Sequence, residues 1–297
     1  MSCNTIAWKN GQWLPFEQAQ LVLDDWGVLQ GAIIVDRLRT IDTRPLDIDL
    51  HLERLKSNCT SIGIAIEDWG LVGKTIIECT EQNQRRLPQR DFAIVVLMTP
   101  GQISMPGVAT TIVHVQPLKW GAMRQWYALG QHLLISKHRN VPGACWSPNL
   151  KTRSRLQYYL ADQEASSNGS LNSAAVLLDM DGHLTETSAA NILCVDRDRR
   201  LVCPPSDSIL NGISLHRTLR LAESLGIEVV RQPITVELAK SASEIILTGT
   251  SACIWPASQF DQIHFEKAIE RPVYHALLAA WIADVGFDFV RGATSEN

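Results

Sequence analysis

The sequence predicts a mixed α/β protein with two domains. Its 297 residues are enough for more than one hydrophobic core, and 45% of them are hydrophobic. Apolar residues follow helical spacing in some segments and strand-like alternation in others, in both halves of the chain. We therefore expect a smaller N-terminal α+β domain at residues 1–117, a linker at 118–131 and a larger C-terminal α/β domain at 132–297.

The N-terminal domain is predicted to open with a β-hairpin. Asn10 and Gly11 form the turn signal between short runs at 6–8 and 12–14. Residues 117–126 are rich in tryptophan and turn-forming residues, which favours a linker at the end of this domain. Between these segments the pattern predicts a strand at 33–40, helices at 46–63 and 67–83, and strands at 92–98 and 111–115.

The C-terminal domain is predicted to contain both helices and strands. A helix begins near Leu156, because Leu156, Tyr159 and Leu160 recur at helical spacing, and Gly169 is expected to end it. The other expected elements are a hairpin of strands at 174–179 and 183–185, a strand at 191–195, a helix that ends at Gly226 and a helix at 274–285.

Charge and cysteine content exclude several classes of protein. The net charge of −4 and the pI near 6.1 give no basic surface for nucleic acid. No apolar run approaches the length of a membrane span, and the N-terminus lacks the features of a signal peptide. The seven cysteines and eight histidines show no metal-binding spacing. We expect a cytoplasmic protein with reduced thiols and no metal.

Two residues stand out as candidates for chemistry. Lys151 lies in a polar, turn-like segment directly before a predicted helix, and Glu186 follows a predicted hairpin. The small residues at 187–190 leave room for a ligand beside that carboxylate. Each residue taken alone is also explained as a solvated side chain, so the assignment depends on the surrounding motif.

The segment around these residues resembles the class IV, or fold type IV, aminotransferases, which use pyridoxal 5'-phosphate. The run DMDGHLTETSAAN, from Asp179 to Asn191, matches the family pattern D-x-x-G-x-(V/L)-T-E-x-S-x-x-N. Lys151 precedes Leu160 by nine residues, as in the lyase and D-amino-acid branches of the family. The resemblance implies that Lys151 is the Schiff-base lysine and that Glu186 keeps the ring nitrogen of the cofactor protonated.

Three further matches indicate where the family binds the cofactor phosphate. The HLERL run resembles H-x-x-R-L, whose arginine, here Arg54, holds the phosphate through a charge-assisted fork. The LNGIS run resembles L-x-G-I-(T/M)-R, so Gly212, Ile213 and Ser214 are expected to cradle the phosphate at a helix N-terminus. The TGTSA run resembles T-G-T-A, which implies that the Thr250 hydroxyl binds a phosphate oxygen.

The sequence departs from the family on the substrate side. Val35 stands where the family has an aromatic residue, Asp36 where it has glutamate, and Leu215 where it has arginine. We interpret these changes as leaving the cofactor residues untouched. Residues 100–113 contain no arginine that would bind a substrate carboxylate. The remaining candidates for that role are Arg124, Lys137 and Arg139.

We therefore predict an aminotransferase that moves an amino group between a 2-keto acid and an amino acid, either branched-chain-like or otherwise small. By resemblance, the cofactor lies at the junction of two domains in a homodimer, and the partners are small molecules, not nucleic acid or a membrane. Aminodeoxychorismate lyase, an enzyme of 4-aminobenzoate and folate synthesis, is an alternative, because the K-x-x-x-R-L run from Lys151 to Leu156 looks like the lyase branch. A non-catalytic relative that binds the cofactor is the second alternative.

Overall fold

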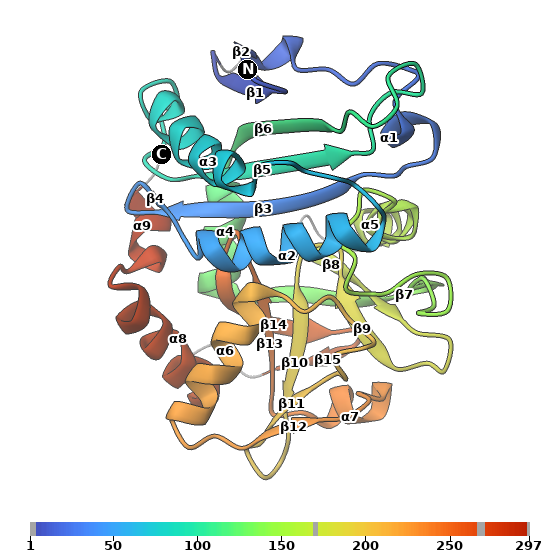
Figure 1. Cartoon of the computed structure of the whole chain (residues 1–297). Coiled ribbons are helices and arrows are strands. Elements are labelled where there is room, and N and C mark those ends of the chain that lie inside the picture. Colours follow the sequence, from blue (N-terminus) through green and yellow to red (C-terminus); the bar gives the residue numbers. More distant parts are fainter. Residues whose placement is uncertain (1–3, 169–171, 266–270, 296–297) are drawn as a thin grey trace. The chain divides into compact units, whose positions relative to one another are not determined.

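Contacts within the chain divide the protein into two compact units. The computed structural model describes residues 4–168, 172–265 and 271–295 (Figure 1). The first unit contains residues 1–118 and 150–154, and the second contains residues 119–149 and 155–297.

The segment that carries Lys151 belongs to the first unit because it pairs with strand β3 (Ile34–Ile41). The Val35 amide donates to the Lys151 carbonyl at 2.9 Å, and the Arg153 amide donates to the Ile33 carbonyl at 3.0 Å. The sequence placed Lys151 in the C-terminal domain. Backbone pairing between segments so far apart in the chain leaves no local pattern from which it could be predicted.

The first unit is built on an antiparallel sheet. Among its described residues, six strands lie in the order β2-β1-β6-β5-β3-β4. The predicted hairpin is confirmed, because Asn10 and Gly11 connect β1 to β2 with φ angles of 42° and 92°. The bounds are β1 Ile6–Lys9, β2 Gln12–Pro15, β3 Ile34–Ile41, β4 Arg44–Pro45, β5 Phe92–Thr99 and β6 Thr110–Pro117.

Helices α2 (Ile48–Ser61) and α3 (Trp69–Gln84) cover one face of this sheet, as Figure 1 shows. Ile34 and Leu38 of β3 join Leu55 of α2 in one hydrophobic cluster. Both helices were predicted, with ends that differ by no more than two residues. Shorter helices, η1 Phe16–Gln18 and α1 Trp26–Leu29, lie between β2 and β3.

The second unit contains a mixed sheet. Its described strands lie in the order β12-β11-β10-β13-β14-β7-β8-β9, with β15 paired to β14. Strand β7 runs parallel to β8 and β14, whereas β10 and β13 are antiparallel and buried along most of their length. The bounds are β7 Gln131–Arg139, β8 Ser173–Leu178, β9 Leu184–Thr187, β10 Asn191–Val195, β11 Leu201–Cys203, β12 Val229–Arg231, β13 Glu244–Gly249, β14 Cys253–Phe260 and β15 Ile263–His264.

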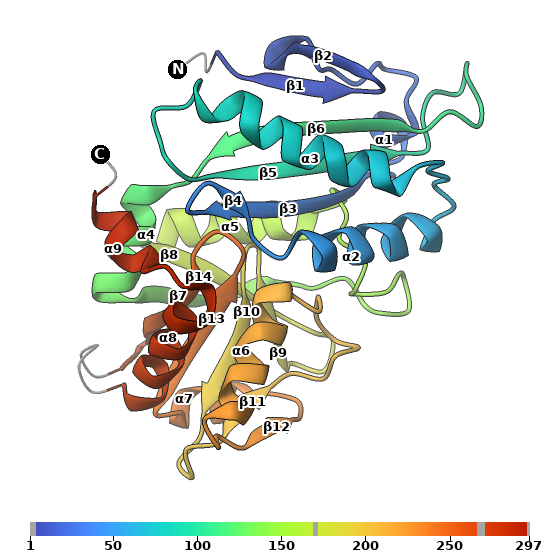
Figure 2. The same ribbon diagram turned by 60° about the vertical axis from the view of Figure 1, so that its left-hand side comes forward.

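The described helices of the second unit are α4 Trp120–Leu129, α5 Leu156–Asn168, α6 Ile213–Ser224, α7 Val236–Ser241, α8 Pro272–Val285 and α9 Phe289–Ser295. Helices α4, α5, α6 and α8 pack against the sheet, and α9 packs against α4. Figure 2 shows α6 beside α8, and Trp281 Nε1 donates to Thr218 Oγ1 between them at 2.9 Å. The Glu244 carboxylate of β13 accepts hydrogen bonds from the Val273 and Tyr274 amides at 3.0 and 2.8 Å, which satisfies the N-terminus of α8. None of the described helices is long and apolar enough to span a bilayer.

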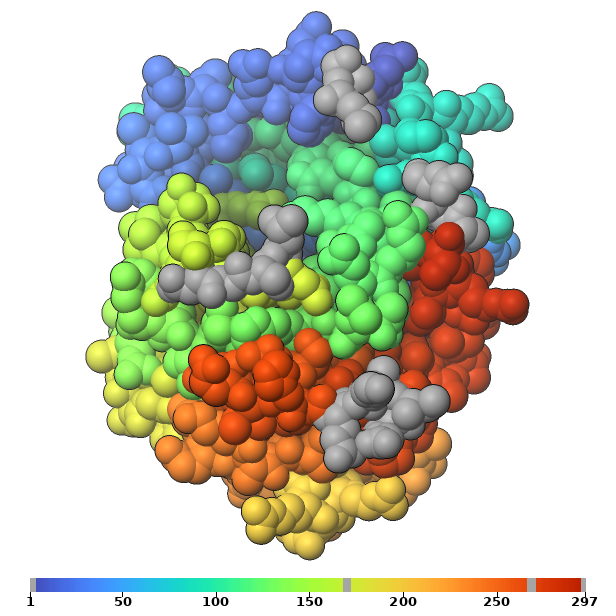
Figure 3. All heavy atoms as spheres, turned by 180° about the vertical axis from the view of Figure 1, so that it is seen from behind, coloured from blue at the N-terminus to red at the C-terminus, as the bar shows by residue number. Residues whose placement is uncertain are grey.

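Residues that the sequence assigned to a linker form helix α4. Trp120, Met123 and Tyr127 are buried, so the aromatic residues that suggested a linker belong to a packed helix face. In Figure 3 the green segment that contains α4 adjoins the red C-terminal segment. Arg124 Nη1 of α4 donates to the Ala293 carbonyl of α9 at 3.3 Å.

Helix α5 exposes the residues whose spacing predicted it. Leu156 and Tyr159 are 69% and 61% exposed, whereas Ala161 and Ala165 pack into the core. Small residues on the buried side allow the helix to lie close to β7 and β8. Gly169, the expected end of this helix, lies outside the described residues.

Most of the described cysteines are buried. Burial raises the pKa of Cys59, Cys79 and Cys194 to about 12, and that of Cys203 to about 11. Cys145, by contrast, is exposed in the loop that follows β7.

Candidate active site

Glu186 is held by hydrogen bonds from several parts of the second unit. It lies within β9 and is only 7% exposed. The Tyr158 hydroxyl of α5 donates to Oε1 at 2.7 Å, and the Asn191 side chain donates to Oε2 at 3.0 Å. The Leu210 amide also donates to Oε2, at 3.3 Å. These donors match an ionised carboxyl group, which accepts hydrogen bonds at both oxygens.

Asn191 connects this carboxylate to the loop before α6. Its Nδ2 also donates to the Leu210 carbonyl at 2.8 Å. A Cβ at Gly212 would lie 2.3 Å from Asn191 Oδ1, so any side chain at that position would displace the asparagine. Asn191 thus lies against both Glu186 and Gly212. Asn191 had no role in the sequence-based site, although its position at the end of the matched run was a signal for one.

Helix α6 begins at Ile213, directly after Gly212, which is its N-cap residue. Ser214 lies inside the first turn and is 7% exposed. The first amides of a helix have no partner within it and are suited to an anion. Thr250 is half-buried in the turn that follows β13, and β13 pairs with β10, the strand of Asn191. The predicted phosphate residues of the second unit therefore come from adjoining elements.

Lys151 is half-buried and its backbone is fixed within the first unit. Its amide donates to Asn58 Oδ1 at 2.7 Å, and its carbonyl accepts the Val35 amide. The preceding Leu150 packs against the hydrophobic cluster of this unit. Contacts on both sides of the lysine thus restrict the directions that its side chain can take.

Arg54 and Asp36 form a buried ion pair, also in the first unit. Arg54 Nε donates to Asp36 Oδ2 at 2.9 Å, and Nη2 donates to Oδ1 at 2.8 Å. His51 Nδ1 lies 2.7 Å from Asp36 Oδ1. Asp36 was interpreted as a change that leaves the cofactor residues untouched, and this interpretation is wrong in one respect. The shorter acid directly contacts Arg54, the arginine that the motif assigned to the phosphate.

Charges around Asp36 balance one another. Burial alone raises the pKa of Asp36, but Arg54 and then His51 outweigh burial and hold this pKa well below its usual value. Burial lowers the pKa of His51 by more than Asp36 raises it, so the imidazole is neutral at pH 7. The Arg54–Asp36 pair therefore carries no net charge. Arg54 provides oriented N–H donors whose charge is already compensated.

Asp36→Asn should lower the free energy of unfolding by about 3–5 kcal/mol at pH 7, because it leaves the buried Arg54 charge without its partner. Equilibrium denaturation measures this loss. The pKa of Asp36 is lower in the folded than in the unfolded protein, so its stabilisation is present above about pH 4 and is lost as the pH falls towards the folded pKa. Asp42→Asn, which breaks an exposed pair with Arg90, is the control and should cost less than about 1 kcal/mol. Equal losses in the two variants would contradict the prediction.

Tyr158 is a site residue that sequence reasoning missed. The Arg155 guanidinium lies 4.4 Å from the centre of its ring. Burial, and then the charge of Glu186, raises the pKa of Tyr158 well above its usual value, so the hydroxyl remains a donor. Tyr159, its neighbour, is 61% exposed. Nothing in the order of residues distinguishes these two tyrosines.

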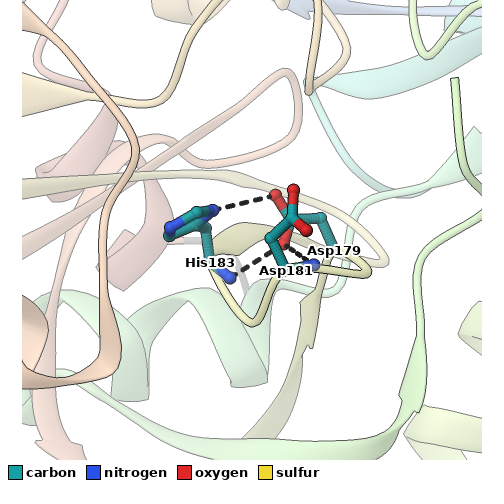
Figure 4. A group of neighbouring side chains, drawn as sticks. All are labelled: Asp179, Asp181 and His183. Carbon is teal, nitrogen blue, oxygen red and sulfur yellow. Dashed lines mark hydrogen bonds and ion pairs between the residues drawn. The ribbon is translucent and has the colours of Figure 1, made fainter.

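A group that resembles a metal site occurs in the turn between β8 and β9. Asp179, Asp181 and His183 offer ligand atoms within 4.8 Å of one another (Figure 4). Asp179 Oδ1 accepts the Asp181 and His183 amides at 3.0 and 2.8 Å, and Oδ2 lies 3.3 Å from His183 Nδ1. These hydrogen bonds are those of a turn closed by an aspartate side chain, and they explain why the three residues lie together.

Comparisons with known proteins identify the family of the chain. Residues 34–260 match the family model described as amino-transferase class IV. The branched-chain-amino-acid aminotransferase of Salmonella typhimurium is 25% identical over 282 residues, which cover 90% of this chain and 88% of the relative. The branched-chain-amino-acid aminotransferase of Escherichia coli K12 is 26% identical over 281 residues, with the same coverage of both chains.

Solved structures show the same fold. A branched-chain aminotransferase from Thermoproteus uzoniensis, solved with norvaline, has a TM-score of 0.80 at 21% identity and covers 93% of this chain and 95% of its own. A hypothetical aminotransferase from Mycobacterium tuberculosis, in its PLP-bound form, has a TM-score of 0.82 at 16% identity and covers 94% of this chain and 100% of its own. Because the family model spans most of the sequence, the chain belongs to the class IV aminotransferases.

Proposed function

We propose that this protein is a pyridoxal-phosphate-dependent aminotransferase that moves an amino group between a 2-keto acid and a branched-chain-like or other small amino acid. The observation that carries the proposal is the Glu186 carboxylate, which Tyr158 and Asn191 orient beside the glycine turn of α6. Membership of the class IV family and likeness to branched-chain aminotransferases support the class of reaction.

The residues present fit pyridoxal phosphate. Glu186 supplies a buried carboxylate that would favour a protonated ring nitrogen. Gly212 has no side chain, which lets Asn191 lie close to the backbone there, and it precedes helical amides that suit a phosphate group. Lys151 supplies an amine, and Arg54 an oriented guanidinium. The residues that we propose hold the cofactor are Arg54, Lys151, Glu186, Gly212, Ile213, Ser214 and Thr250.

The protein groups have distinct roles in the proposed reaction. When bound, pyridoxal phosphate supplies an electron sink for negative charge at the substrate α-carbon. Lys151 would hold the cofactor through its side-chain amine, and the same amine would take and return the proton of the substrate α-carbon. Glu186 would hold a proton at the ring nitrogen, and Tyr158 and Asn191 keep its carboxylate oriented.

Protein supplied with pyridoxal phosphate should transfer amino groups from branched-chain or other small amino acids to 2-oxoglutarate, measured as the glutamate formed. Lys151→Ala should lose this activity, because the reacting amine is absent. Borohydride should also no longer fix the cofactor to this variant. Lys240→Ala, which removes an exposed lysine of the second unit, is the matched control and should keep both the activity and the fixed cofactor. Pyruvate release from aminodeoxychorismate without a keto acid would indicate the lyase instead. Bound cofactor without turnover would indicate the non-catalytic relative.

Glu186→Gln should retain the cofactor but slow the proton transfer about a hundredfold or more, because the charge opposite the ring nitrogen is lost. Stopped-flow absorbance of the first half-reaction measures this rate. Tyr158→Phe is the matched variant, since it removes one hydrogen bond and keeps the carboxylate charge, and it should have a smaller effect. Normal rates in the glutamine variant would show that Glu186 does not act on the ring nitrogen.

We also propose that the protein is a homodimer. The first unit carries an apolar patch whose side chains are between 39% and 83% exposed. Its two segments are joined by hydrogen bonds from the Trp26 amide to the Gly101 carbonyl at 2.9 Å and from the Ile103 amide to the Asp24 carbonyl at 3.0 Å. Contiguous apolar patches on a soluble protein mark interaction sites. The patch consists of Val22, Leu23, Trp26, Val28, Leu29, Ile103, Met105 and Val108.

Light scattering should show a dimer for the wild type and a monomer for the double variant Leu23→Asp, Ile103→Asp, because two charges in the apolar patch would have to be buried. Leu225→Asp is the control, since Leu225 is 46% exposed in the second unit, and this variant should remain dimeric. A monomeric wild type, or a double variant that stays dimeric, would exclude this patch as the interface.

A further inference from the structure

The sheet of the first unit has two faces with different surroundings. Ile34 and Leu38 of β3 join the hydrophobic cluster under α2 and α3, and Asp36 contacts Arg54 of α2. Successive residues of a strand point to opposite faces of its sheet. Val35 and Arg37 therefore point away from these helices.

The segment that carries Lys151 follows the same alternation. Leu150 packs against the cluster on the helix side, and Thr152 forms a bridge with β3. Lys151 and Arg153 alternate with these two residues. The Lys151 carbonyl accepts the Val35 amide at 2.9 Å, so Lys151 lies beside Val35 on the face that is turned away from the helices.

His114 lies on this face as well. Arg37 of β3 and His114 of β6 both stand directly opposite Val95 of the intervening strand β5. Residues that are opposite in register share a face of the sheet. Because β5 lies between β3 and β6, the Cα atoms of Arg37 and His114 are two strand spacings, or about 10 Å, apart. Arg37 Nη1 donates to Gln116 Oε1 at 2.6 Å, which directs the guanidinium across β5 towards β6.

Basic groups on this face affect one another. Burial, and then the charge of Arg153, lowers the pKa of Arg37 to about 10. Burial lowers the pKa of His114, a hydrogen bond with the Val115 carbonyl opposes this shift, and both arginines add to it. Like charges gathered in a partly buried place repel one another, and an anion bound among them relieves the repulsion.

We propose that Arg37, His114 and Arg153, the basic cluster, bind the carboxylate of the amino-acid and keto-acid substrates. The inference rests on the proposed function, because it takes Lys151 to be the amine that the substrate amine displaces. The substrate carboxylate is attached to the carbon that bears this amine, so it has to bind on the face of Lys151.

Distance and chemistry both suit this role. Lys151 and Arg153 are two residues apart in an extended segment, which separates their Cα atoms by about 7 Å. Guanidinium groups bind carboxylates through two parallel hydrogen bonds, a geometry that a lysine does not offer. The candidates suggested by sequence alone, Arg124, Lys137 and Arg139, all belong to the second unit.

Isothermal titration of the cofactor-loaded protein tests the basic cluster without turnover. Isovalerate presents one carboxylate, as a small amino acid does, and glutarate presents two. Arg37→Gln and Arg153→Gln should each weaken binding about tenfold or more, because each removes a charged donor. Arg37→Lys should restore part of the affinity, since it keeps the charge but not the fork. Lys240→Gln, which changes an exposed lysine of helix α7, is the control and should bind both ligands as the wild type does.

Steady-state kinetics with an active amino acid gives a second readout, in which KM should rise in the glutamine variants far more than kcat falls. Weaker binding of both ligands assigns the basic cluster to the α-carboxylate, and weaker binding of glutarate alone assigns it to a side-chain carboxylate. Unchanged affinity in both glutamine variants overturns the proposal, and so does a wild type that binds neither ligand. Failure of the proposed function is distinct, because it would appear as absence of amino transfer by the wild type.

Discussion

The hydrogen bonds to Glu186 are the constraint on which the second unit most depends. Tyr158 comes from α5, Asn191 from β10 and Leu210 from the loop before α6, and all of them donate to this one carboxylate. A buried carboxylate is unfavourable unless donors satisfy both oxygens. Helix, strands and loop must therefore be placed together. Gly212 is subject to the same constraint, since the asparagine occupies the space of a side chain there.

Local features of the fold could be predicted, whereas features that depend on distant partners could not. The Asn10–Gly11 hairpin and the strand at 191–195 follow from turn chemistry and a continuous apolar run, which are properties of neighbouring residues. Helix α4 was missed because Trp120 and its neighbours look like a loop until their packing surface is known. The pairing of the Lys151 segment with β3 joins residues more than a hundred positions apart, and no local pattern reports it.

In the candidate site, too, residues inside local motifs could be predicted, whereas their distant partners could not. Glu186 and Gly212 were identified because they lie inside short motifs with fixed spacing, and both adjoin Asn191 in the structure. Arg54 was identified in the same way, but its partner Asp36 lies on another element and was assigned to the substrate side. Tyr158 could not be chosen over the adjacent tyrosine, because burial decides which hydroxyl becomes a donor. Motifs therefore predict candidate residues, and tertiary packing determines which neighbours hold them.

The burial of the cysteines has a consequence for labelling the protein. Thiol reagents attack the thiolate, and Cys59, Cys79 and Cys194 rarely ionise at neutral pH, since burial raises their pKa to about 12. Among the described cysteines, Cys145 is the exposed one. Among the described cysteines, a maleimide dye would therefore attach preferentially at this position, six residues before Lys151 in the chain. Its fluorescence would report changes around the loop that follows β7 during turnover.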